Sequence, residues 1–149
     1  MKLASAEKYI RELFEKHIPC HVREKMELIS VNKKDRSLDV KIHADKSRGV
    51  LYQNNNQLQG GYAAVFADAN MWLALMLDRS LRKKIIRTAK IDIYWFKYVS
   101  ADEDLTANAR FIRSETKDDK TKFYSSAKIK NQKGETVAVI KATNQLIEE

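Results

Sequence analysis

The chain has 149 residues, enough for one domain with its own core, and no linker or repeat divides it, so we predict a single domain over residues 1–149. Its single cysteine excludes an intramolecular disulfide framework and a multi-cysteine metal site, and we expect no metal. The net charge of +8 favours an anionic partner, such as a phosphorylated cofactor, nucleic acid or an acidic membrane surface, and the sign alone does not choose among them.

Cysteine usage and the apolar segments favour a reducing, cytoplasmic location. Cys20 is typical of a small packed residue, and the charged, amphipathic N-terminal stretch lacks the apolar core of a signal peptide. The apolar run Tyr62–Leu77 contains Asp68 and Asn70, and it is shorter than the about 20 residues that a membrane span needs. We therefore expect a buried helix there and no membrane span.

The N-terminal part of the chain predicts a helix followed by a β-hairpin. The helix covers about Ser5–Lys16, with Ser5 as its N-cap, and Pro19 ends it. A strand near Glu24–Val31 and the alternating strand Leu38–Ala44 pair around a polar turn.

The remainder predicts a long helix and then antiparallel strands. A polar connector, Asp45–Leu58, leads to a central helix that ends near Asp78 and is apolar on nearly every face, so we expect it to be buried all round. The expected strands are Thr88–Val99, one beginning at Leu105, Lys122–Lys130 and Thr136–Ile147, with turns at Glu115–Lys120 and Asn131–Gly134. This order predicts an α+β fold, a curled antiparallel sheet wrapped around the central helix, with an extra N-terminal helix.

Gly60 and Gly61 open the central helix, and Asp68 lies within it. Bare backbone N–H groups at a helix start stabilise a carbonyl oxygen that gains negative charge. Close packing of the helix against a strand is the alternative explanation for the two glycines. A buried carboxylate is costly unless it is functional or satisfied by a neighbour such as Arg or Tyr.

The spacing of these residues predicts a site shared between two subunits. Gly61 and Asp68 are two helical turns apart, about 10 Å along the axis, whereas catalytic contacts are about 3 Å long. If both act on one carbonyl, Asp68 comes from a second subunit, so we expect a homodimer or a dimer of dimers.

The chain has a Gly-Gly pair with an acid eight residues after Gly60, and strands follow the helix. Over about Gln53–Ile147, this pattern resembles the hotdog-fold acyl-CoA thioesterases of the phenylacetate-pathway and 4-hydroxybenzoyl-CoA types. The position of Trp72 is similar to that in a subgroup of thioesterases of unassigned substrate. The resemblance implies that the Gly60 N–H polarises a thioester carbonyl, and that Asp68 is a nucleophile or activates water. It implies no cofactor beyond the coenzyme A of the substrate.

The resemblance also assigns supporting roles, with departures. Gln59 replaces the family's His; it can donate a hydrogen bond but cannot shuttle a proton. The implied substrate-binding residues are Gly61, Gln53, Asn54, Thr88 and Lys90. Among these, Gln53 stands where Asn is usual, and Asn54 is adjacent to it. Lys90 stands where Ser or Thr is usual, with Thr88 two residues earlier on what we expect to be the same strand face.

Other residues support weaker interpretations. His17, His21 and His43 lie outside the motif, and we expect His43 to be exposed. A basic cluster is either a solvated helix end or a grip on coenzyme A phosphates; it comprises Arg79, Arg82, Lys83, Lys84, Arg87 and Lys90. The strand aromatics are either core residues or walls of an acyl or adenine pocket; they are Tyr94, Trp95, Phe96 and Tyr98.

The leading prediction is hydrolysis of an acyl-CoA or other acyl thioester. The replacement of His by Gln59 motivates an alternative, a non-catalytic hotdog module that binds acyl-CoA or a related ligand. A nucleic-acid-binding protein rests on charge alone, because no glycine-aromatic RNA motif or zinc signature is present, and we expect no nucleic-acid partner. A hydratase or dehydratase on the same fold is a minor alternative. It would typically need a His near the acid, and no His lies near this motif.

Overall fold

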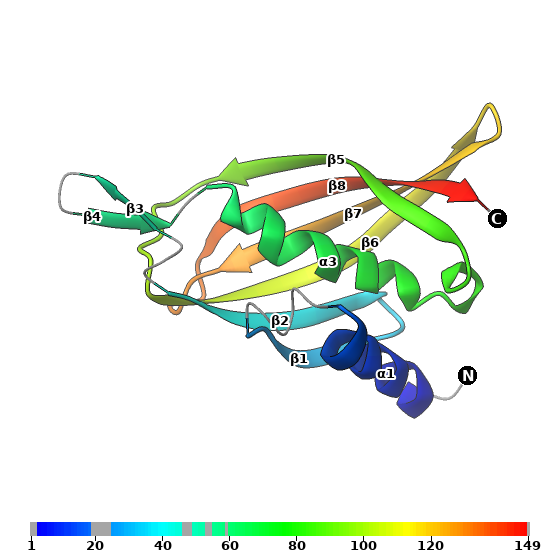
Figure 1. Cartoon of the computed structure of the whole chain (residues 1–149), viewed down its shortest axis with the longest axis horizontal. Helices are drawn as coiled ribbons and strands as arrows, with labels where there is room; N and C mark the ends of the chain where they lie inside the picture. The colour runs from blue at the N-terminus through cyan, green and yellow to red at the C-terminus, as the bar shows by residue number, and fades with distance from the viewer. Residues whose placement is uncertain (1–2, 19–24, 46–48, 53–54, 59, 149) are drawn as a thin grey trace.

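The computed structural model describes residues 3–18, 25–45, 49–52, 55–58 and 60–148. One antiparallel six-stranded sheet, in the order β1-β2-β6-β7-β8-β5, curls around helix α3 (Figure 1). Its strands are β1 (Glu27–Asn32), β2 (Ser37–Ala44), β5 (Ile85–Trp95), β6 (Glu103–Lys117), β7 (Lys120–Lys130) and β8 (Thr136–Glu148). The predicted α+β architecture, a curled sheet around one central helix, is confirmed.

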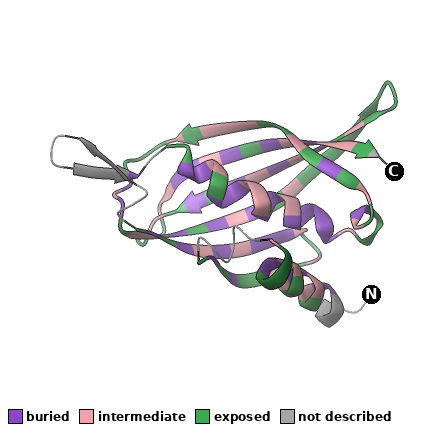
Figure 2. Ribbon diagram, in the orientation of Figure 1, coloured by how far each residue is buried: buried purple, intermediate pink, exposed green. Residues whose placement is uncertain are grey.

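Helix α3 (Tyr62–Met76) supplies much of the core. The inner face of the sheet packs against it with apolar side chains that recur at every second position, such as Leu38, Val40 and Ile42 of β2. The prediction that the helix is buried all round is nevertheless wrong, because the sheet covers only part of its circumference (Figure 2). Val65 is 42% exposed, and a half-buried stripe runs beside it, formed by Ala64, Asp68, Ala69 and Trp72.

Strand β5 contains a bulge that decides which side chains face the helix. Thr88 is opposite Asn144 of β8 and Lys90 is opposite Thr143, so Ala89 is an extra residue in β5. The extra residue reverses the alternation, and Thr88 lies on the inner face while Lys90 lies on the outer face. The prediction that both share one face is therefore wrong.

Two segments differ from the predicted elements. The connector before α3 is not irregular throughout, because β3 (Gly49–Tyr52) and β4 (Asn55–Leu58) pair in a small antiparallel hairpin. The predicted turn Glu115–Lys120 is mostly strand. The actual turn is the pair Asp118 and Asp119, whose φ angles of 50° and 59° suit a two-residue hairpin turn.

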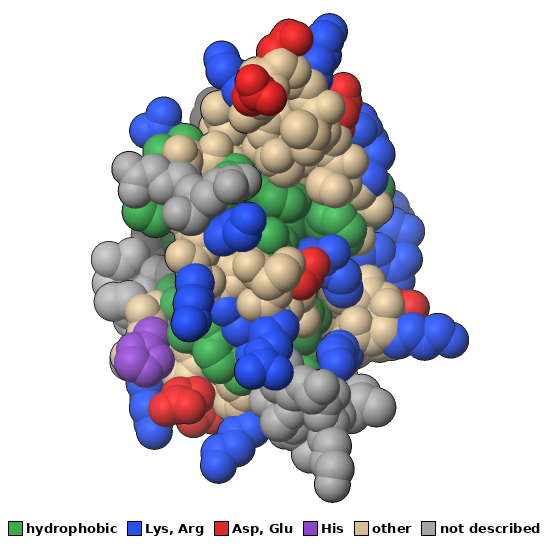
Figure 3. Space-filling view, turned by 90° about the vertical axis from the view of Figure 1, so that its right-hand side faces the viewer, with side chains coloured by type: hydrophobic (Ala, Val, Ile, Leu, Met, Phe, Trp, Pro, Cys, Tyr) green, Lys and Arg blue, Asp and Glu red, His purple; other side chains and the backbone are tan. Residues whose placement is uncertain are grey.

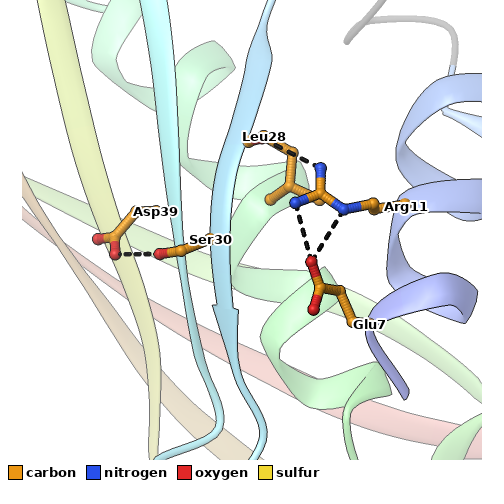
Figure 4. A network of polar contacts seen from close by, with 5 residues as sticks. All are labelled: Glu7, Arg11, Leu28, Ser30 and Asp39. Atoms are coloured by element: carbon orange, nitrogen blue, oxygen red, sulfur yellow. Dashed lines mark hydrogen bonds and ion pairs between the residues drawn. The ribbon is translucent and has the colours of Figure 1, made fainter. Parts of the chain in front are cut away.

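The N-terminal helix α1 (Leu3–Glu12) packs beside β1 and continues into a π-helical turn, η1 (Leu13–His17). Because α1 begins before Ser5, the predicted N-cap at Ser5 is wrong. Arg11 anchors the helix: its guanidinium donates to Glu7 at 2.9 Å and to the Leu28 carbonyl of β1 at 3.3 Å (Figure 4). In the described part of the chain, no helix is long and apolar enough to cross a membrane.

Candidate functional site

The start of α3 has no side-chain cap among the described residues. Gly61 is the N-cap residue and makes no side-chain cap; the N–H of Ala64 bonds to the Gly61 carbonyl at 3.1 Å. A Cβ at Gly60 would meet the Trp95 indole nitrogen at 3.5 Å, an ordinary contact, and a Cβ at Gly61 would meet nothing within 4 Å. Among the described residues, then, close packing does not require either glycine. In the described part of the chain the space beside Gly61 is open, and without Cβ atoms both glycines leave the backbone N–H groups at the start of α3 more accessible to a ligand.

A depression of about 260 Å³ lies beside Gly60. Its other lining residues come from β4, β5 and the segment after β5, and they are Leu58, Trp95, Lys97, Tyr98 and Val99. Of the strand aromatics, Trp95 packs partly against the core, whereas Tyr94, Phe96 and Tyr98 are 47%, 61% and 57% exposed. The core interpretation therefore holds in part for Trp95 and is wrong for the other three.

Asp68 lies two turns further along α3 and is held by a residue of β5. The Thr88 hydroxyl donates to Oδ1 of Asp68 at 2.7 Å, and the side-chain amide of Asn144 donates to Thr88 Oγ1 at 3.1 Å. In the described chain no Arg or Tyr bonds to Asp68, so the satisfying neighbour is Thr88. Asn144 could not be predicted as a site residue from the sequence, because it is 56 residues from Thr88 and only the register of β5 and β8 brings the two side chains together.

Asp68 also lines a second depression, of about 330 Å³, between α3 and the edge of the sheet. The apolar residues around it are Ala64, Val65, Ala69 and Ile91. Asp68 is half-buried rather than buried as predicted. Gly60 and Asp68 line different depressions of one chain, as expected for residues about 12 Å apart along a helix axis.

The remaining candidates separate. Lys90 is exposed on the outer face and pairs with Asp92 at 3.2 Å, so it lies on the opposite side of the sheet from Asp68. Gln59, Gln53 and Asn54 lie outside the described residues. In the portion of the chain that is described, no three His, Cys, Asp or Glu side chains gather closely enough to hold a metal ion.

The predicted basic cluster is also divided. Arg82 faces the protein: its Nε donates to the Met76 carbonyl at 2.9 Å, and its guanidinium stacks on Tyr9 at 3.8 Å. Arg79, Lys83 and Arg87 are exposed. Arg82 therefore serves the end of α3, and only the exposed members could reach a phosphate group.

No family model and no curated protein is similar to the chain in sequence. Solved structures are similar in fold. The PaaI protein from the phenylacetic acid degradation operon of E. coli aligns over 98% of this chain and 96% of its own, with a TM-score of 0.76 and 18% identity. The chain has the hotdog fold.

Two further hotdog structures align over most of the chain. A mutant of the phenylacetic acid degradation protein PaaI from Thermus thermophilus covers 87% of this chain and 100% of its own, with a TM-score of 0.68 and 14% identity. A hypothetical thioesterase from Streptococcus pneumoniae, solved with coenzyme A, covers 83% and 87%, with a TM-score of 0.65 and 18% identity. At these identities the similarity establishes the fold.

Proposed function

We propose that the protein hydrolyses an acyl-CoA or a related acyl thioester. The observation that carries the proposal is the setting of Asp68. Oδ1 accepts a hydrogen bond from Thr88, and Asp68 lines a depression at the sheet edge whose other lining residues are apolar. A carboxylate fixed by one oxygen has its other oxygen available to accept a proton from water.

The second component of the proposed site is the start of α3, where no side chain of the described residues caps the helix. The N–H of Gly60 would donate to the thioester carbonyl oxygen as it gains negative charge, assisted by the positive end of the helix dipole. Since Gly60 and Asp68 of one chain are too far apart, Asp68 of a second subunit would act on the carbonyl held at Gly60. The names of the fold's neighbours, which include a hypothetical thioesterase solved with coenzyme A, support this class of substrate.

Mutation of Asp68 tests the proposal. Hydrolysis of acyl-CoAs from acetyl to palmitoyl, with benzoyl and phenylacetyl, would be followed with a thiol-detecting dye. We expect Asp68→Ala and Asp68→Asn to lower turnover at least about 100-fold, because both remove the base. Asp92→Asn, on the outer face of β5, is the matched control and should retain activity. Full activity in both Asp68 variants would refute the assignment.

Gln59 motivates a second candidate, a non-catalytic acyl-CoA-binding module. Gln59 can hold a carbonyl or an amide by hydrogen bonds but cannot transfer a proton at neutral pH. This candidate predicts saturable binding of a CoA ester in a calorimeter, with no thiol released over hours. Gln59→His would then be the variant to assay, and turnover that appears with it would identify Gln59 as the cause of inactivity.

A further inference from the structure

Asn144 lies on β8 beneath α3 and is fully buried. Its neighbours along the inner face of β8 are Ala142 and Leu146, and Phe123 of β7 is directly opposite. Burying an amide among such side chains is unfavourable unless its hydrogen bonds are made. The amide Nδ2 donates to Thr88, whereas Oδ1 of Asn144 is buried with no partner among the described residues. Packing alone therefore does not explain an asparagine at this position.

The direction of the hydrogen bonds indicates how Asn144 acts on Thr88. A threonine hydroxyl carries one hydrogen. Because the Asn144 amide donates to Thr88 Oγ1, the hydroxyl uses a lone pair there and retains its hydrogen for Oδ1 of Asp68. The opposite orientation of the amide would draw that hydrogen toward Asn144, leaving Asp68 without its donor and burying an NH₂ group with no acceptor.

The relay also links three elements at one point. Asp68 belongs to α3, Thr88 to the bulge of β5 and Asn144 to β8. The bulge is what places Thr88 on the inner face, so Thr88 sits where the strand is least regular. A hydrogen bond from a fully buried, rigid strand position would hold the Thr88 rotamer there and, through it, the carboxylate of Asp68.

We infer that Asn144 is a positioning residue for the reaction. It orients the Thr88 hydroxyl as a donor and thereby fixes the carboxylate of Asp68 toward the depression at the sheet edge. The inference rests on the proposed hydrolysis, in which Asp68 takes a proton from water. A carboxylate free to rotate would present its proton-accepting oxygen in the productive direction only part of the time, which lowers kcat more than it changes KM.

The kinetic test removes the relay while filling the space of the side chain. In Asn144→Leu, whose side chain has the same number and branching of heavy atoms, we expect kcat to fall about 10- to 100-fold with KM nearly unchanged. Thr88→Val should give a similar loss. The double variant should lose no more than either single one, because both changes break the same relay. Ser125→Ala is the matched control: Ser125 is also buried on the inner face, its hydroxyl has no partner in the described chain, and its removal should leave kcat unchanged.

A conservative variant guards against loss of the fold. Asn144→Asp keeps the shape of the side chain, but its ionised form can only accept a hydrogen bond. Its kcat should recover relative to that of the wild type as the pH falls and the new carboxyl group becomes a donor. Additive losses in the Thr88 and Asn144 variants, or a kcat of Asn144→Asp that follows the wild-type pH profile at a constant ratio, would overturn the inference.

A measurement without substrate separates this inference from the proposed function. In the unliganded protein, the ¹³C resonance of the Asp68 carboxyl carbon should move in the same direction in Asn144→Leu and Thr88→Val, and remain in place in Ser125→Ala. If no thioester is hydrolysed but the resonances move, the proposed function fails and the relay stands. If hydrolysis depends on Asp68 but the Asn144 variant moves neither the resonance nor kcat, the relay fails.

Discussion

Single residues outside the site also have definite physical roles, and His43 is the clearest. Its Nδ1 and Nε2 lie 2.7 Å from Asp104 and 2.9 Å from Asp102, and Lys41 is 3.5 Å from Asp104. The hydrogen bond to Asp104, then the one to Asp102, raises the pKa of His43 above its usual 6.5. His43 is exposed as predicted, and it links the end of β2 to Asp104 at the start of β6 and to Asp102 just before that strand.

This arrangement predicts a pH-dependent contribution to stability. A histidine whose pKa is higher in the folded than in the unfolded protein stabilises the folded state. This stabilisation is complete when the pH is below the unfolded-state pKa of about 6.5, and it is lost as the pH rises through the folded-state pKa. The urea midpoint of the wild type should therefore exceed that of His43→Gln at pH 5.5, and the difference should narrow by pH 8.5. A difference that is constant with pH would contradict the ion-pair interpretation.

At the residue scale, the sequence predicts what lies within one helix but not what crosses the sheet. The spacing from Gly60 to Asp68 places Gly60 just before the start of α3 and Asp68 two turns into it, because helix geometry is regular. The sequence makes Thr88 a candidate site residue only because it lies two residues before Lys90. The extra residue Ala89 decides whether Thr88 or Lys90 lies on the same side of the sheet as Asp68. A bulge of this kind cannot be predicted from the alternation of polar and apolar residues.

At the element scale, two arginines cap the C-terminal end of α3. Arg82 donates to the Met76 carbonyl, and Arg36 donates to the Leu75 carbonyl at 3.4 Å. Asp78 lies close by. Burial would raise the pKa of Asp78, but hydrogen bonds from Ser80 and the charges of the two arginines outweigh it and lower the pKa. The last carbonyls of the helix are thus satisfied by cations that also favour its dipole.

We predict that Arg82→Ala lowers the free energy of unfolding by about 2 kcal/mol, because it removes a charged hydrogen bond and the stacking on Tyr9. Arg79→Ala is the control. That side chain is exposed on the same turn, and its loss should change stability by no more than about 0.5 kcal/mol. Urea unfolding of both variants measures the difference. Equal effects would show that only the net charge at the helix end matters.

Elements were predictable where their side chains alternate or their turns carry Gly and Asn. The hairpin turn after β7 closes with Gly134 at a φ of 77°, as its sequence predicts. The ends of β6 and β7 were not predictable. Residues 112–120 are exposed, so neither face of this ribbon needs apolar residues, and strand and turn have the same polar composition there.

At the scale of the whole molecule, the distribution of charge and apolar surface indicates which face a second copy would cover. Lys and Arg side chains gather along the right-hand side of Figure 3, with few acids among them. On the outer face of the sheet, the cations include Lys90, Arg110, Arg113, Lys128, Lys130 and Lys141. Two such faces would repel each other. The edge of β5 has no partner strand among the described residues, and Val65 and Ile91 beside it are apolar.

We therefore predict a homodimer formed along β5 and the open stripe of α3, with each site shared between subunits. Light scattering should give a dimer mass or a multiple of it, and Val65→Lys should dissociate that dimer and abolish turnover.

Shared sites also predict complementation. Asp68→Asn and Gly60→Pro, which removes the Gly60 N–H, should each be inactive alone. In an equal mixture reassembled from dissociated subunits, half of the dimers are mixed and each holds one intact site, so about one quarter of wild-type activity should return. No recovery in a mixture shown by mass spectrometry to contain mixed dimers would place both residues in one subunit's site and refute the shared arrangement.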